Sequence, residues 1–248
     1  RALRDAVRWG LAPANAAAAA DPPRARRPEM TVWSPAQLHD FLRQAADDSH
    51  YTLWLFYLLT GMRRGEALAL RWSDVDLDRA TATVRRSLVP VDHGLSFGEP
   101  KTARGRRRIG LDPELVAALA AHRRRTSGAG GDAAGAGTAG GHEDGDALVF
   151  AHPDGSPLHP ERVSRWFARA VRRTGAPPIR LHDLRHLHAT LALAAGVPVR
   201  VVADRLGHSS TAVTTDIYQH VLPEMDHDAA RAVAGLVFPA GAPEAGVR

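Results

Sequence analysis

Residues 51–66 read YTLWLFYLLTGMRRGE, and within this stretch the chain changes from a continuous apolar segment to a basic one. Residues 51–59 are apolar on nearly every side of a helix, which is typical of a helix buried in a core. Thr60 and Gly61 end that helix, and a third helix follows with Glu66, Leu68 and Leu70. The stretch therefore predicts a central buried helix followed directly by a short basic turn.

Further elements are predicted on both sides of this stretch. Upstream, Ser34-Pro35 supplies an N-cap and a proline at the first helical position. Downstream, residues 81–84 have β propensity, and residues 107–111 provide a returning strand around a loop at 94–100. Helices are predicted at about 112–125, 160–174, 182–195, 198–206, 210–221 and 224–236. The sequence thus predicts an α+β fold, mainly α-helical, with a small antiparallel β-sheet at about 75–111.

The amino-acid composition excludes several kinds of site and favours one kind of partner. The 248 residues contain no cysteine, which excludes disulfide scaffolds, thiolate zinc sites, iron–sulfur clusters and cysteine nucleophiles. The formal net charge is +5 and the isoelectric point is about 10.5, which favours a polyanionic partner. Lys101 is the single lysine in an arginine-rich chain. No apolar run approaches the ~20 residues of a membrane span, so we expect a soluble, cytoplasmic protein.

Two stretches differ in composition from the rest. Residues 1–29 pass from a short helical pattern into an Ala- and Pro-rich segment, which is typical of a linker. Residues 127–145 contain eight glycines and five alanines in 19 positions. Such a segment cannot bury enough apolar surface to order itself, so we predict a flexible surface insertion there.

Five short segments carry side chains suited to chemistry: T-G-M-R-R-G-E at 60–66, P-K-T at 100–102, L-H-D-L-R-H at 181–186, L-G-H-S-S at 206–210 and I-Y-Q-H at 217–220. Each alone is a weak signal, since an arginine three residues before a glutamate is usually a helix-surface ion pair. In this order and context, however, they closely resemble the catalytic domain of the tyrosine recombinase (phage integrase) family. The resemblance covers residues 31–222.

The resemblance gives roles to six residues. The family's signature is an arginine, a lysine in a β-hairpin, a His-x-x-Arg pair, a further histidine and a nucleophilic tyrosine. The matching positions in this sequence are Arg63, Lys101, His182, Arg185, His208 and Tyr218. Glu66 matches the acidic residue beside the first arginine, where a supporting role is expected.

These residue types suit in-line attack on a phosphodiester. Two arginines hold the non-bridging oxygens bidentately and stay charged at any working pH. Tyrosine must lose its proton as it attacks, and we expect His182 and His208 to titrate near neutrality and to accept or supply that proton. A lysine on a hairpin beside the DNA, Lys101, is the expected acid for the departing 5′-oxygen.

The resemblance implies a site-specific recombinase or integrase that cleaves and rejoins DNA strands through a covalent 3′-phosphotyrosyl intermediate, with no cofactor and no metal. Residues 1–29 would be the end of an N-terminal core-binding domain and its linker, 30–238 the catalytic domain and 239–248 a tail. Double-stranded DNA is the expected partner, with no membrane partner. We expect a monomer in free solution and a tetramer on paired DNA sites, in which a helix after Pro223 docks on a neighbouring protomer.

Two other functions fit parts of the pattern. His182 and His186 lie four residues apart with Asp183 between them, as in a zinc hydrolase, but a metal site needs a third ligand and Arg185 opposes a cation. A DNA-binding relative without catalysis would share the fold, but no expected side chain is missing.

The remaining histidines and arginines are assigned more general roles. His186, His188 and His220 are interpreted as structural or adjacent to DNA. Five basic residues are interpreted together as contacts to DNA phosphates: Lys101, Arg104, Arg106, Arg107 and Arg108.

Overall fold

The computed structural model describes residues 2–20, 32–92, 94–99, 105–129 and 146–208. The chain divides into two units, Arg1–Thr31 and Val32–Arg248. The first unit contains helix α1 (Ala2–Arg8), which has no buried residue, and the 3-10 helix η1 (Ala16–Ala19). The described residues of the predicted site all belong to the second unit.

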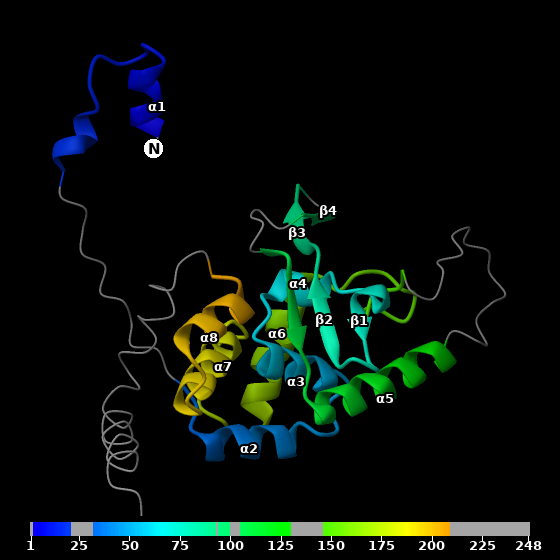
Figure 1. The fold of residues 1–248 in the computed structure, drawn as a ribbon. Helices are drawn as coiled ribbons and strands as arrows, with labels where there is room; N and C mark the ends of the chain where they lie inside the picture. Colours follow the sequence, from blue (N-terminus) through cyan, green and yellow to red (C-terminus); the bar gives the residue numbers. More distant parts are fainter. Residues whose placement is uncertain (1, 21–31, 93, 100–104, 130–145, 209–248) are drawn as a thin grey trace, which may run out of the picture. The chain divides into compact units, whose positions relative to one another are not determined.

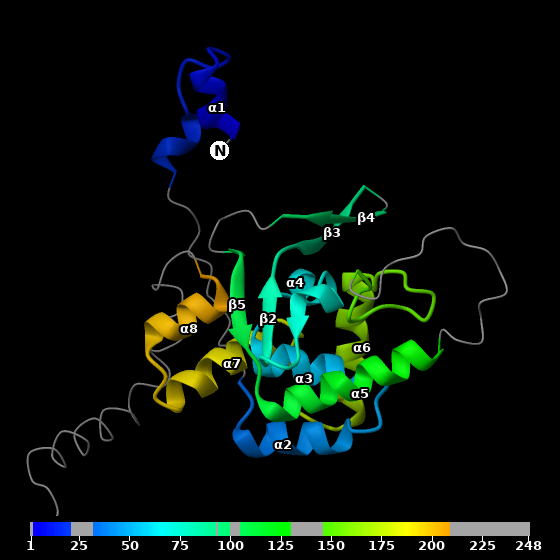
Figure 2. The ribbon, with the colours of Figure 1, turned by 45° about the vertical axis from the view of Figure 1, so that its right-hand side comes forward.

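The second unit combines helices with two small antiparallel sheets. Its elements are α2 (Pro35–Gln44), α3 (Tyr51–Thr60), α4 (Arg64–Leu68), η2 (Trp72–Asp74), β1 (Val75–Asp76), β2 (Thr81–Val84), β3 (Ser87–Val91), β4 (Gly94–Gly98), β5 (Arg107–Gly110), α5 (Pro113–Ala129), α6 (Pro160–Arg173), α7 (Asp183–Ala194) and α8 (Val199–Leu206). Strands β1, β2 and β5 form one sheet in the order β1-β2-β5, and β3 and β4 form a separate hairpin. Figure 1 and Figure 2 both show this hairpin extending beyond the helices and the sheet. The predicted α+β, mainly helical fold with a small antiparallel sheet is confirmed.

Helix α3 lies in the core, as its apolar sequence predicts. Eight of its ten residues are buried, so no face of the helix is left to solvent. It contacts α5 on one side and α7 on another. The helix that will carry part of the site, α7, is therefore positioned directly against the core.

Helix α2 begins where the sequence predicts. The Ser34 hydroxyl accepts the Gln37 N–H at 3.3 Å, and the Gln37 side chain accepts the Ser34 N–H at 2.9 Å. This reciprocal capping satisfies two backbone donors that the helix itself cannot. Phe41 on α2 then packs on Trp33 and on Phe167 of α6, with ring centroids 4.9 and 5.8 Å apart.

Three predicted boundaries differ from the structure. The loop predicted at 94–100 is wrong for residues 94–98, which form β4 and pair with β3 from Ser87↔Gly98 to Val91↔Gly94. Helix α4 ends at Leu68, so Leu70 lies beyond it, and α5 continues to Ala129, three residues into the predicted insertion. Residues 130–145 and the helices predicted at 210–221 and 224–236 lie outside the described residues. No helix in the described part is long and apolar enough to cross a membrane.

Candidate active site

Arg63 is held at the start of α4 by the acidic residue three positions later. Gly61 ends α3 with a φ of +63°, and Arg63 then occupies the N-cap of α4. The Glu66 carboxylate accepts the Arg63 backbone N–H at 3.0 Å and its Nη1 at 2.8 Å. The Arg63 side chain is still 43% exposed, so its guanidinium remains accessible to a molecule arriving from solvent.

Glu66 links Arg63 to a second arginine, Arg107 on β5. Arg107 Nη2 and Nη1 donate to the two Glu66 carboxylate oxygens at 2.7 and 3.2 Å, and only 5% of the Glu66 side chain is exposed. Burial by itself raises the pKa of Glu66, but the hydrogen bonds and charges of Arg107 and Arg63 outweigh it and hold that pKa below its usual value. Glu66 is therefore an ionised, buried support for both guanidinium groups.

The burial of Arg107 corrects one prediction. Its side chain is only 7% exposed, so it is not available to contact a DNA phosphate. Residues two apart in a strand face the same side, and Ile109, two positions on, is a core residue. This alternation was visible in the sequence and could have placed Arg107 on the inward face. The neighbouring Arg106 and Arg108 are exposed.

Arg185 on α7 lies deep beside Arg63. It is 5% exposed, and its guanidinium donates to the main-chain oxygens of Gly61 and Leu206, both at 2.7 Å. Burial and then the charge of Arg63 lower the pKa of Arg185 to about 9, so it stays positively charged at neutral pH. Two such cations side by side are favourable for binding an anion that relieves their repulsion.

Three histidines complete the cluster, and they are neutral at pH 7. Burial lowers the pKa of His182 to about 4, and the ring of His186, 5.0 Å away, adds to the effect. Burial also lowers the pKa of His208 to about 4, helped by the charges of Arg185 and Arg63. The expectation that His182 and His208 titrate near neutrality is therefore wrong for the protein alone. Neutral imidazoles can accept a proton, which suits a base more than an acid.

The surroundings of Asp183 do not favour a zinc site. Its carboxylate accepts the backbone N–H of Arg180 at 2.7 Å and the guanidinium of the same residue at 3.0 and 3.2 Å. In the described part of the chain, no three histidine, aspartate or glutamate side chains come together as metal ligands. His182 and His186 thus lack a third ligand among these residues.

The structure brings together four of the six predicted residues. Arg63, His182, Arg185 and His208 are close enough for their charges to alter one another's pKa values, directly or through Arg185. A cavity of about 680 Å³ opens beside them and is lined by Arg63 and His182, together with residues of β3 and α6. Lys101 and Tyr218 lie outside the described residues, as do Arg104 and His220.

Sequence reasoning gave too little weight to two residues of this region. His186 was assigned a general role, although its spacing of four from His182 on a helix predicts that the two rings meet. Arg205 received no role at all. Its side chain reaches across several elements, as described below, and no local pattern indicates such long-range contacts.

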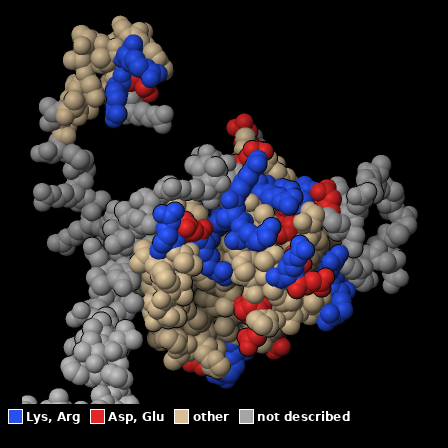
Figure 3. All heavy atoms as spheres, viewed as in Figure 1, with Lys and Arg blue, Asp and Glu red and all other residues tan. Residues whose placement is uncertain are grey.

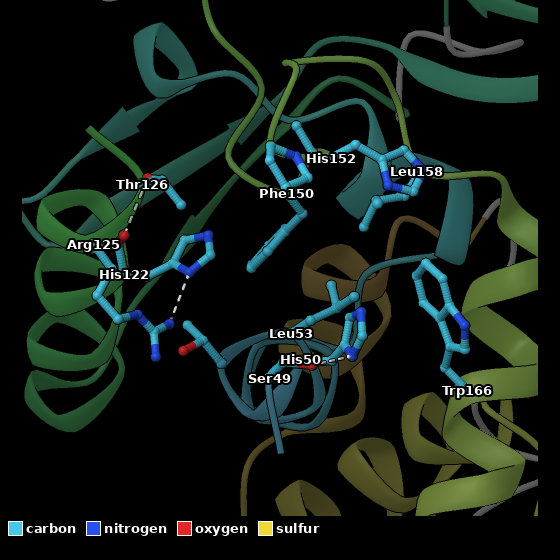
Figure 4. A pocket seen from close by; sticks show the side chains of 13 residues that line it. Ser49, His50, Leu53, His122, Arg125, Thr126, Phe150, His152, Leu158 and Trp166 are labelled. Carbon is cyan, nitrogen blue, oxygen red and sulfur yellow. Dashed lines mark hydrogen bonds between the residues drawn. The ribbon is translucent and has the colours of Figure 1, made fainter. Parts of the chain in front are cut away.

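A second cavity, of about 440 Å³, contains none of the predicted catalytic residues (Figure 4). His50 stacks on Trp166 there, with ring centroids 4.4 Å apart. His122 is bonded to the Val149 oxygen at 2.8 Å and to Arg125 at 3.2 Å. These polar side chains are engaged with the protein itself, so the cavity is not assigned a part in the chemistry.

Basic side chains gather over the sheet and the β3–β4 hairpin on the face shown in Figure 3. A broad cavity of about 740 Å³ on this region is lined by Arg71, Arg85, Arg86 and Arg106. Arg85 and Arg86 both pair with Asp74, at 3.4 and 3.2 Å. Part of the positive charge is therefore neutralised within the protein.

Comparison with known proteins gives consistent matches. The family model described as "Phage integrase family" matches residues 34–225. The ICEBs1 integrase of Bacillus subtilis is 28% identical over 206 residues, which are 82% of this chain and 54% of that protein. The putative prophage phiRv2 integrase of Mycobacterium tuberculosis is 31% identical over 206 residues, which are 82% of this chain and 51% of that protein. The chain thus spans about half the length of these curated relatives.

Solved structures show the same fold. The Tn1549 transposon integrase in complex with transposon right end DNA superposes with a TM-score of 0.69 at 24% identity, covering 85% of this chain and 66% of that one. A lambda integrase tetramer bound to a Holliday junction gives a TM-score of 0.61 at 18% identity, covering 87% of this chain and 55% of that one.

Proposed function

The chain belongs to the phage integrase family, and from this membership we propose that it is the catalytic part of a site-specific recombinase, which cleaves and rejoins DNA strands through a 3′-phosphotyrosyl intermediate. The observation that carries the proposal is the cluster of Arg63, Arg185, His182 and His208. It places two cations, anchored on a carboxylate and on main-chain oxygens, next to neutral imidazoles. This combination suits the binding and activation of a phosphodiester.

Each residue has a defined task in the proposed reaction. Arg63 and Arg185 bind the non-bridging oxygens, whose negative charge grows during in-line attack. The Tyr218 oxygen forms a bond to phosphorus while the bond from phosphorus to the 5′-oxygen breaks. His182 or His208 accepts the phenolic proton, and Lys101 protonates the departing 5′-oxygen. The phosphotyrosyl bond conserves the energy of the diester, so the reverse attack rejoins the strand without ATP.

The proposed partners are double-stranded DNA and further copies of the chain. Solved relatives described as bound to DNA, and a lambda integrase described as a tetramer on a Holliday junction, support both. We propose that this chain is a monomer in solution and assembles as a tetramer on two paired sites, linked by the segment after Pro223. We also propose that residues 1–29 end a core-binding domain, that 30–238 form the catalytic domain with an insertion after α5, and that 239–248 are a tail.

Covalent trapping tests the proposed chemistry. The substrate is a pool of duplexes with a randomised sequence around a nick, which lets the cleaved end diffuse away. The pool is incubated with the protein, and the products are resolved on a denaturing gel. We expect a protein–DNA adduct that survives denaturation, is lost in Tyr218→Phe and is kept in Tyr51→Phe, a matched change at a half-buried tyrosine of α3. Absence of an adduct from the wild type, or its persistence in Tyr218→Phe, contradicts the proposal; the former result favours a DNA-binding relative without catalysis.

A further inference from the structure

The carboxyl end of α8 anchors three arginines through consecutive main-chain oxygens. The pairs are Arg107 Nε with the Arg205 oxygen at 2.7 Å, Arg185 Nη2 with the Leu206 oxygen at 2.7 Å and Arg63 Nη2 with the Gly207 oxygen at 2.9 Å. The last carbonyl groups of a helix accept no hydrogen bond from within the helix and lie at the negative end of its dipole. They are therefore favourable acceptors for positively charged side chains. Any movement of this helix end therefore displaces all three guanidinium groups.

The same helix end fixes His208. Gly207 has a φ of +67°, and its N–H donates to the Asp204 oxygen at 3.1 Å. The N–H of His208 reaches back to the Ala203 oxygen at 3.0 Å. These two bonds form a Schellman motif, in which the residue after the glycine has a defined direction. The position of His208 thus depends on where the last turn of α8 lies.

The Arg205 side chain bonds that turn to three neighbouring elements. Its Nη2 donates to the Leu59 oxygen of α3 at 2.9 Å and to the Gly110 oxygen of β5 at 3.0 Å. Its Nε donates to His188 Nε2 of α7 at 3.1 Å. One side chain therefore ties the end of α8 to the strand that carries Arg107, to the helix that carries Arg185 and to the helix that leads into Arg63.

His188 can accept this bond only as the neutral ring. Its Nδ1 lies 2.8 Å from the Leu58 oxygen, which can only accept, so Nδ1 carries the hydrogen and Nε2 offers its lone pair to Arg205. Burial, followed by the charge of Arg205, lowers the pKa of His188 to about 4 and keeps the ring neutral at pH 7. His188 and Leu206 also pack closely against Gly61 at the end of α3. A Cβ added to Gly61 would lie 2.8 Å from His188 Cδ2 and 2.6 Å from Leu206 Cδ2.

From this geometry we propose that Arg205 is a positioning residue for strand cleavage, which holds the end of α8 so that His208, Arg63 and Arg185 converge on one phosphate. Its Nε and Nη2 donate to His188 and to two protein oxygens, so it acts through the elements that it holds. The inference rests on the function proposed above and adds to it a residue outside the six.

Single-turnover cleavage of a duplex recovered by covalent trapping tests the role. Misplacing a catalytic group by about 1 Å can cost ~10²-fold in rate, so we expect Arg205→Met to slow cleavage by about that factor while DNA affinity changes by less than about threefold. Arg205→Lys keeps a donor for one carbonyl but cannot reach three acceptors. We therefore expect it to cleave about tenfold faster than Arg205→Met and still more slowly than the wild type. Arg71→Met is the matched control, since half-buried Arg71 also donates to a main-chain oxygen, that of Asp146 at 2.9 Å.

Histidine NMR gives a second readout that does not depend on activity. In the wild type and in Arg71→Met, we expect His208 to stay neutral down to a pH near 4. In Arg205→Met, and more weakly in Arg205→Lys, release of the helix end should raise the His208 pKa toward ~6.5. An unchanged cleavage rate, or an unchanged His208 titration in both Arg205 variants, overturns the inference. If the wild type itself forms no adduct, the proposed function fails, and the titration still decides whether Arg205 fixes His208.

Discussion

Replacing Glu66 by glutamine removes the only charge that the structure places between Arg63 and Arg107 in the part of the chain that it describes. Glu66 and Arg107 are 5% and 7% exposed, so the change leaves a buried guanidinium without its carboxylate. Removing one partner of a buried pair costs about 3–5 kcal/mol, whereas the contact with the 43% exposed Arg63 contributes less than about 1 kcal/mol. The glutamine amide keeps an oxygen that can accept a hydrogen bond from Arg107. We therefore expect Glu66→Gln to lower the free energy of unfolding by about 3 kcal/mol, the lower end of this range.

Urea unfolding followed by linear extrapolation measures this loss at pH 7. A domain of this size loses about 2–4 °C of Tm per kcal/mol, so calorimetry should show a decrease of about 6–12 °C. The matched control is Glu99→Gln, since Glu99 pairs with Arg106 at 2.9 Å with both side chains mostly exposed. The control should cost less than about 1 kcal/mol.

The double variant Glu66→Met with Arg107→Met isolates the cause. Replacing a buried pair by apolar groups is often neutral, so the double variant should be more stable than Glu66→Gln alone. The pKa of Glu66 is below its usual value in the folded state, so its stabilisation is complete above about pH 4.5 and is lost as the pH falls through the folded pKa. A cost for Glu66→Gln no larger than that of Glu99→Gln, or one independent of pH down to 3, would refute the reasoning.

Three further predictions concern the proposed chemistry. Lys101→Ala should slow cleavage by ~10²–10⁴-fold with little loss of DNA affinity, and a substrate with a 5′-thio leaving group, which needs no protonation, should rescue it; no rescue would mean that Lys101 only binds phosphate. In the folded protein the pKa values of His182 and His208 are lowered to about 4. The stability that the neutral rings contribute is therefore complete above about pH 6.5 and is lost as the pH falls toward 4. Unfolding of His182→Gln and His208→Gln across this pH range will measure that loss. Deleting residues 224–248 should leave cleavage of a single site largely intact but abolish recombination of two sites, and normal recombination by the truncated chain would contradict the proposed linkage.

The sequence predicted those parts of the fold that depend on local pattern. The cap at Ser34, the apolar run of α3 and the helical periodicity of α6 to α8 are each readable within about ten residues. The β3–β4 hairpin escaped prediction because Pro90 and the glycines of β4 are typical of loops. A two-stranded hairpin tolerates such residues, since each strand has a free edge where a proline needs no hydrogen bond.

The candidate site was predictable in its residue types but not in its electrostatics. The order of motifs indicated Arg63, His182, Arg185 and His208 by resemblance. Their burial arises from contacts far apart in the chain, such as Arg185 with Gly61 and with Leu206. Neither the lowered histidine pKa values nor the burial of Arg107 in an ion pair can be obtained from spacing without that packing.

Because the arginines of the cluster bind main-chain oxygens at the end of α8, some positions of this helix tolerate mutation and others do not. A carbonyl oxygen is present whatever side chain its residue bears, so substitutions at the exposed Val201 of this helix leave all three arginine acceptors in place. Gly207 is different, because a φ of +67° is costly for any residue with a Cβ, and a change there would turn the very carbonyl that Arg63 uses. Substitutions at exposed positions of α8 such as Val201 should therefore leave the cluster intact, whereas Gly207 is strongly constrained.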